Sequence, residues 1–177
     1  MTYGELDSED KVEIGRLATW SVSSAKTSHG LDMLRDNNLD TYWQSDGPQP
    51  HLVNMNFEKK TSVQQVSIYY DLKQDESYTP LRISIRAGTA YHDLKELVNM
   101  EVEGITGWAN ITLEDALGSG RPPRVFMLQL AIISNQLGGR DTHIRQIKLF
   151  TTRVPHPSGD ELLPFTSPEF LRRSTLR

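Results

Sequence analysis

A group of residues able to do acid–base or metal chemistry stands late in the chain, in the stretch GGRDTHIRQ. Asp141 and His143 are two residues apart and follow Arg140. A carboxylate beside an imidazole can position a proton or hold a metal ion. No second pair of ligands stands at a telling spacing, and no nucleophile or oriented triad accompanies the pair. We therefore interpret the group as a structural or binding element, and expect no metal and no other cofactor.

Adjacent carboxylates offer a second route to chemistry, at Asp75–Glu76 and Glu114–Asp115. A glycosidase needs two carboxyl groups held at a fixed separation, and adjacency in the chain does not supply it. Both pairs are expected to be solvated acids in loops. The chain also lacks a phosphate-binding loop, a dinucleotide fingerprint and the G-x-S-x-G motif of hydrolases. No enzymatic activity is predicted.

Two further stretches combine aromatic and polar residues ahead of predicted strands. Residues 42–51 (YWQSDGPQPH) contain Trp43, and residues 75–80 (DESYTP) contain Tyr78. Trp43 is expected to close one end of the hydrophobic core, the alternative being a platform for a ligand. If both stretches lie beside residues 140–143, they form a polar recognition surface on a rigid scaffold.

The elements that position these residues are predicted to be strands, because apolar residues alternate with polar ones through much of the chain. Residues 125–133 are apolar on both faces, which is typical of a central strand. Turn-rich stretches separate about eight such runs, so the fold class is all-β, an antiparallel sandwich. The clearest alternation is at residues 53–57, 66–70, 81–87 and 109–113.

Two local features depart from simple alternation. In the last strand, Ile144 lies on one face but Ile147 and Leu149 lie on the other, and a β-bulge near residues 145–146 would reconcile them. Residues 30–36 (GLDMLRD) are predicted to form one short helix.

Composition limits the classes of partner. The formal net charge of -4 argues against nucleic acid, which is bound by clustered Lys and Arg. The apolar residues 125–133 are too short to cross a bilayer, and no secretory signal is visible. Zero cysteines exclude disulfides, zinc sites built on cysteine and thioester chemistry. Their absence favours cytosol or nucleus, so the expected location is nucleus and cytoplasm.

Three regions are predicted: an N-terminal arm (1–13), a sandwich domain (14–153) and a C-terminal tail (154–177). The tail contains four prolines and no alternation, and it ends with three arginines in its last six residues. Such a tail is expected to be a docking peptide or a disordered terminus.

Four stretches in the same order resemble the DOC-domain family of anaphase-promoting complex subunit 10. They are ATWSVSSAK, LRDNNLDTYWQSDGPQPHLVNMNF, DESYTPLRISIRAG and GGRDTHIRQIKLF, and together they run from about Ile14 to Phe150. The resemblance implies a jelly-roll sandwich similar to galactose-binding and discoidin-like domains.

The resemblance also implies a function and partners. Members of this family are non-catalytic subunits of a ubiquitin ligase whose cullin and RING parts are on other chains. They help a WD40 coactivator to capture substrates that carry a destruction box, and so raise processivity. The residues expected to face the degron are Ser45, Asp46, Gln49, Pro50, His51, Ser77, Tyr78, Arg140, Asp141, Thr142 and His143.

The end of the chain carries a further implication of the resemblance. Family tails typically end in Ile-Arg and dock in a groove of a TPR-repeat scaffold subunit, whereas this chain ends in Leu176 and Arg177. Leucine keeps an aliphatic side chain, so docking is expected. Gly138 stands where family members often have Asn, which removes one side-chain hydrogen bond.

A carbohydrate- or small-ligand-binding sandwich is the alternative function, because the implied fold is shared with lectin-like domains. Lectins often stack sugars on exposed aromatic rings. An exposed Trp43 would favour the alternative, and a buried one would favour the degron receptor.

Overall fold

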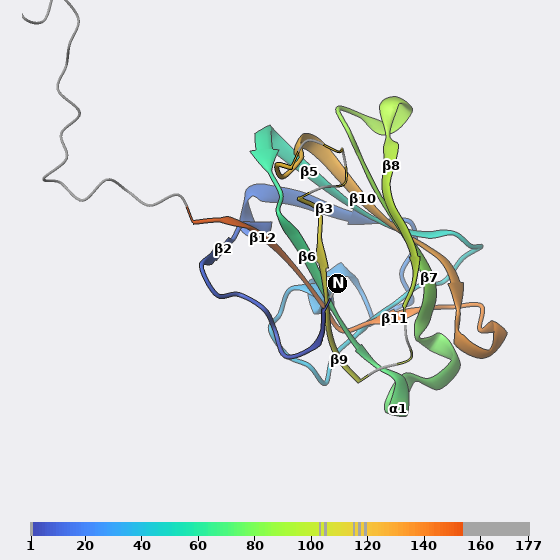
Figure 1. The fold of residues 1–177 in the computed structure, drawn as a ribbon. Coiled ribbons are helices and arrows are strands. Elements are labelled where there is room, and N and C mark those ends of the chain that lie inside the picture. Colours follow the sequence, from blue (N-terminus) through green and yellow to red (C-terminus); the bar gives the residue numbers. More distant parts are fainter. Residues whose placement is uncertain are drawn as a thin grey trace, which may run out of the picture.

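The computed structural model describes residues 2–102, 104, 106–114, 116, 118 and 120–153. The predicted tail, with its docking residues Leu176 and Arg177, lies outside the described residues. Two antiparallel five-stranded sheets enclose one hydrophobic core, which confirms the predicted all-β jelly-roll sandwich (Figure 1).

The first sheet has the strand order β1-β9-β6-β12-β2, and the second has the order β3-β5-β10-β7-β8. The strands of the first are β1 (Thr2–Gly4), β9 (Thr106–Thr112), β6 (Gln65–Asp71), β12 (Gln146–Thr152) and β2 (Lys11–Glu13). The strands of the second are β3 (Ala18–Val22), β5 (His51–Ser62), β10 (Arg124–Asn135), β7 (Pro80–Gly88) and β8 (Lys95–Glu101). A separate pair joins β4 (Trp43–Gln44) to β11 (His143–Ile144).

The core is built from the inward positions that alternation predicted. Val53 and Met55 of β5, and Ile83 and Ile85 of β7, are each fully buried. Their strands flank β10, which is central as predicted. Since successive side chains of a strand point to opposite faces, the outward positions of β5 and β10 carry a mixture of polar and apolar residues. Gln129 of β10, for example, donates to Asn54 of β5 at 2.8 Å.

The sheet register decides where the three candidate stretches lie. His51, at the start of β5, is opposite Ile132 near the end of β10. Pro80, at the start of β7, is opposite Asn135 at the end of β10. The segments before β5, before β7 and after β10 therefore leave the sandwich at the same end.

The predicted last strand is in fact two strands, β11 and β12, which belong to different sheets. This break explains the phase shift, for which a bulge within one strand was expected. Ile144 in β11 pairs with Trp43, whereas Ile147 in β12 pairs with Ile68 of the first five-stranded sheet. Arg145 lies between the two strands. Both isoleucines still reach the same core.

Short helices fill the connections. The predicted helix at residues 30–36 is a 3-10 turn, η2 (Leu31–Leu34). The pair Asp75–Glu76, predicted to lie in a loop, stands instead where α1 (Leu72–Asp75) is followed by η3 (Glu76–Tyr78). The Asp71 side chain caps α1, because it accepts the amide hydrogens of residues 73 and 74. The remaining turns are η1 (Gly15–Leu17), η4 (Tyr91–Asp93) and η5 (Gln136–Gly138).

The first 13 residues, assigned to an arm on sequence grounds, contribute strands to the sandwich. Strand β1 pairs with β9, and β2 pairs with β12. Within the described part of the chain, no helix is long and apolar enough to cross a membrane.

Candidate functional site

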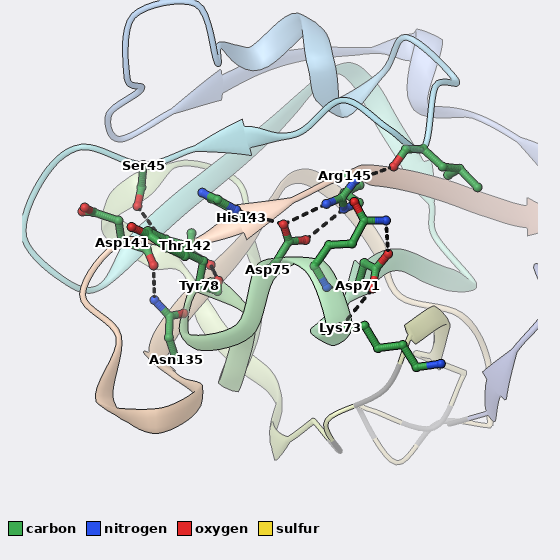
Figure 2. Close-up of polar contacts among 12 residues, drawn as sticks. Ser45, Asp71, Lys73, Asp75, Tyr78, Asn135, Asp141, Thr142, His143 and Arg145 are labelled. Atoms are coloured by element: carbon green, nitrogen blue, oxygen red, sulfur yellow. Dashed lines mark hydrogen bonds and ion pairs between the residues drawn. The ribbon is translucent and has the colours of Figure 1, made fainter.

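The three predicted stretches meet at one end of the sandwich, where they bond to one another. We call the segments 45–51, 75–79 and 135–143 the first, second and third loops. Figure 2 shows how residues of all three converge around the strand that carries His143. The third loop is central, because both others bond to it.

The first loop is tied to the third through backbone groups. The Thr142 amide donates to Ser45 Oγ at 2.9 Å, and the Ser45 amide donates to the Thr142 carbonyl at 3.1 Å. The Arg140 carbonyl lies 2.7 Å from His51 Nε2 and accepts from Gln49 Nε2 at 3.2 Å. Because buried polar groups need partners, these bonds fix where the third loop passes over the first.

The second loop packs closely against the third. Thr142 Oγ1 donates to the Tyr78 carbonyl at 3.2 Å, and the Gln136 amide donates to the Thr79 carbonyl at 2.8 Å. A Cβ built on Gly139 would lie 1.8 Å from the Ser77 carbonyl oxygen. Only glycine fits at this approach of two backbones.

Four rings stack across the same end, in the order His29, Tyr42, His143 and Tyr78. The successive centroids are 4.5, 4.1 and 4.2 Å apart, and the planes are inclined by 8°, 25° and 11°. Stacked aromatic rings stabilise by dispersion and exclude water. Tyr78 closes the stack and is 39% exposed, so part of its surface faces solvent.

Beneath the stack, the Asp75 carboxylate contacts two side chains, those of Arg145 and His143. Arg145 donates to it twice, Nε to Oδ2 at 2.9 Å and Nη2 to Oδ1 at 2.8 Å. His143 Nδ1 lies 3.0 Å from Asp75 Oδ1. The Asp75 residue is only 4% exposed. The prediction that Asp75 is a solvated loop acid is therefore wrong, because its carboxylate is buried against Arg145 and His143.

Opposing influences set the pKa of Asp75. Burial acts to raise the pKa, but hydrogen bonds from His143 and Arg145, with the positive charge of Arg145, outweigh it and the pKa lies below its ordinary value. For Arg145, burial acts to lower the pKa, and the bonds and negative charge of Asp75 raise it above its ordinary value. The pair is thus ionised at neutral pH, and it ties α1 to the segment that directly follows the third loop.

The pairing considered from sequence, Asp141 with His143, has a different geometry. His143 Nδ1 faces Asp75, and the Asp141 carbonyl accepts from Asn135 Nδ2 at 2.7 Å. Among the described residues, no three His, Asp or Glu side chains are grouped to hold a metal ion.

Exposure divides the eleven predicted degron-facing residues into three sets. The buried set, which connects the loops, is Ser45, His51, Thr142 and His143. The accessible set is Asp46, Gln49, Pro50, Tyr78 and Arg140, and the half-buried residues are Ser77 and Asp141. Within the described part of the chain, the side chains of Asp46 and Arg140 make no ion pair. A ligand at this end would therefore meet free charges of both signs.

Sequence reasoning did not single out Arg145, or Tyr42 and His29 as ring partners. Their local sequence carried no signal of a site, because their partners are distant in the chain. It also missed Leu137, which is 87% exposed at the tip of the third loop. Its positive φ of 53° is a conformation that leucine rarely adopts.

The family model for anaphase-promoting complex subunit 10 (APC10) matches residues 3–175. The chain belongs to this family. The resemblance inferred from four sequence stretches is thereby confirmed, and the match includes residues 3–13, which those stretches did not use.

Curated APC10 relatives agree with this assignment. The human anaphase-promoting complex subunit 10 is 52% identical over 139 residues, covering 78% of this chain and 74% of the human one. The Dictyostelium discoideum subunit is 47% identical over 168 residues, covering 95% of this chain and 88% of its own length. The Drosophila melanogaster subunit is 55% identical over 137 residues, covering 77% and 69%.

Solved structures place the APC10 fold among carbohydrate-binding modules. The family 32 module of Clostridium perfringens NanJ, in complex with galactose, has a TM-score of 0.66 at 15% identity, covering 80% of this chain and 99% of the module. Two such modules of C. perfringens ZmpB give a TM-score of 0.68 at 11% identity, covering 85% of this chain and 40% of theirs. At this identity the likeness concerns the fold alone. Trp43 is fully buried and donates to the Ser24 carbonyl at 3.0 Å, so it cannot stack a sugar.

Proposed function

We propose that this chain is a non-catalytic subunit of the anaphase-promoting complex that binds destruction-box degrons jointly with a WD40 coactivator. Membership of the APC10 family supports the assignment to the complex. The observation that carries the degron role is the accessible charge at the loop end. Asp46 and Arg140 project from loops that buried bonds hold in place, so they meet a ligand in a fixed arrangement.

Charge complementarity suggests how such a surface reads a peptide. Asp46 suits a basic side chain of the degron, Arg140 suits a carboxylate or backbone carbonyl, and the exposed part of Tyr78 suits an aliphatic stem. Exposed contacts of this kind are individually weak. When the coactivator holds another part of the same peptide, the second binding event is intramolecular and weak contacts suffice.

A second proposed attachment involves the tail outside the described residues. Leu176 and Arg177 would dock in a TPR-repeat scaffold subunit, with the cullin and RING subunits supplying catalysis. The two attachments separate anchoring in the complex from substrate capture.

The double variant Asp46→Ala with Arg140→Ala tests the degron role. A complex reconstituted with this variant should attach fewer ubiquitins to each substrate in one binding encounter. If each lost contact contributes about 0.7 kcal/mol, the fraction of substrate that receives several ubiquitins in one encounter should fall about tenfold. The readout is single-encounter ubiquitination of a destruction-box substrate.

The matched control is Glu9→Ala with Arg16→Ala, which also removes one charge of each sign from exposed positions outside the three loops. Both proteins should incorporate into the complex equally. If the loop variant incorporates normally and processivity is also normal, this surface does not bind the degron.

A further inference from the structure

A cavity of about 300 Å³ opens at the end of the sandwich away from the three loops. It lies where β5 and β7 end and β10 and β8 begin, since Lys60, Gly88, Arg124 and Lys95 all line it. Figure 1 shows the two ends: α1 lies at the bottom of the molecule, and the yellow-green turn η4 beside β8 lies at the top. One family stretch reaches the pocket, with Ala87 and Gly88 at its end, whereas none of the proposed degron residues lines it. We call it the basic pocket.

The floor of the basic pocket is apolar. Ala87 and Val125 line it and belong to the hydrophobic core, with exposures of 7% and 6%. Leu97, which packs partly buried against the core, adds a third apolar wall. Phe126 completes the lining and is 36% exposed, a high value for so large an apolar side chain. The volume and lining suit one large apolar side chain.

The rim of the pocket is cationic. Lys60, Lys95 and Arg124 line it, and in the described part of the chain none of them forms an ion pair. Asp93 is the acid on the rim, but its Oδ1 already accepts the amides of residues 89 and 90, each at 2.8 Å. The rim is therefore positive in a chain whose formal net charge is -4.

The surroundings favour a peptide as the occupant. Strand β8 is the last strand in the order of its sheet, and its first residue, Lys95, is on the rim. An extended segment can lie along such an edge and insert an alternate side chain into a neighbouring pocket. Lys95 stands on this edge, and together with Lys60 and Arg124 it favours an acidic partner at the pocket.

We propose that the basic pocket docks an acidic peptide segment of a partner protein, with one aromatic or aliphatic side chain on the apolar floor and flanking carboxylates on Lys60, Lys95 and Arg124. This surface is distinct from the loop end, so one chain can hold a degron and this segment at once. The contact lies partly in solvent, so its affinity falls as salt is raised.

The test selects a displayed library of random 12-residue peptides on the intact chain. Recovered peptides are then labelled with fluorescein and titrated by anisotropy. Acidic peptides with a central Phe, Leu or Trp should dominate. Lys60→Glu with Lys95→Glu should weaken their binding at least about tenfold, and Phe126→Ser should do the same without changing charge.

The matched control is Lys26→Glu with Lys73→Glu, which changes the net charge equally at exposed lysines that do not line the pocket. It should weaken binding less than about twofold. The proposal is overturned if acidic peptides are not enriched, or if the control weakens them as much as the pocket variant does. It is also overturned if Phe126→Ser leaves binding unchanged. Thermal melts of every variant establish that it is folded.

Discussion

The carboxylate of Asp75 and the guanidinium of Arg145 form a bidentate ion pair that is almost completely buried. Both nitrogen–oxygen distances are below 3.0 Å, and the side chains are 4% and 3% exposed. The pair joins α1, ahead of β7, to the short segment between β11 and β12. It thereby fixes the second loop against the segment that directly follows the third, beneath the residues that face solvent.

Replacement of Asp75 by Asn should destabilise the domain by about 3 kcal/mol, because Arg145 would remain buried without its counter-charge. Urea unfolding measures the change. The control is Glu76→Gln at the exposed neighbour, expected to lie within about 0.5 kcal/mol of the parent. Equal effects of the two substitutions would mean that the buried pair does not stabilise the fold.

The same pair predicts a dependence on pH. The pKa of Asp75 is lower in the folded chain than in the unfolded one, so its contribution is complete above about pH 4 and is lost as the pH falls through the folded value. The stability difference between the parent and Asp75→Asn should therefore be constant from pH 7 to about pH 5. Below about pH 4 it should shrink by up to about 1.4 kcal/mol per pH unit. Unfolding in urea at a series of pH values measures this stability difference directly. A difference that grows on acidification would contradict a lowered pKa for Asp75.

Gly139 should tolerate no side chain. Gly139→Ala would place Cβ against the Ser77 carbonyl and force the second and third loops apart, so both stability and amide protection of η3 and η5 should fall. Hydrogen exchange of these amides measures the separation. Gly138→Asn is the matched control. Gly138 has a positive φ of 73° with open space around it, and Asn accepts that conformation. Comparable loss of protection in both variants would argue against the close approach.

Deletion of Leu176 and Arg177 should weaken incorporation into the complex and leave the melting temperature of the domain unchanged. The reason is that the proposed docking needs the aliphatic side chain, the guanidinium and the terminal carboxylate together. Copurification with TPR-repeat and cullin subunits provides the readout, and Leu176→Ile, which restores the usual family ending, should copurify at least as well as the parent. Undiminished copurification of the truncated chain would exclude the tail as the anchor.

The sequence predicted the framework because strand patterns are local. Alternation at residues 81–87 and 53–57 placed Ile83, Ile85, Val53 and Met55 on inward faces, where the structure has them. The α1 turn escaped prediction, since four residues are too few for a helical period to appear. The break between β11 and β12 at Arg145 was visible in the sequence as a shift in the alternation of apolar residues. Its cause was not visible, because β11 pairs with β4 in a separate sheet.

The site was harder to predict, because its decisive contacts join distant parts of the chain. His143 was considered with Asp141, two residues away, yet its partner is Asp75, 68 residues away. Burial was equally invisible: Ser45 and Thr142 look like surface polar residues, and both are fully buried. Hydrophobic periodicity gives no information about polar groups that are buried because they form hydrogen bonds with polar groups of another loop.

The affinity of a fluorescein-labelled destruction-box peptide for the complex and its coactivator tests the central claim most directly. With this chain present, binding should be at least about tenfold tighter than with the coactivator alone. With Asp46→Ala and Arg140→Ala, the added affinity should be lost, while Glu9→Ala with Arg16→Ala retains it. If the loop variant binds the peptide as tightly as the parent, the loop end is not the degron receptor.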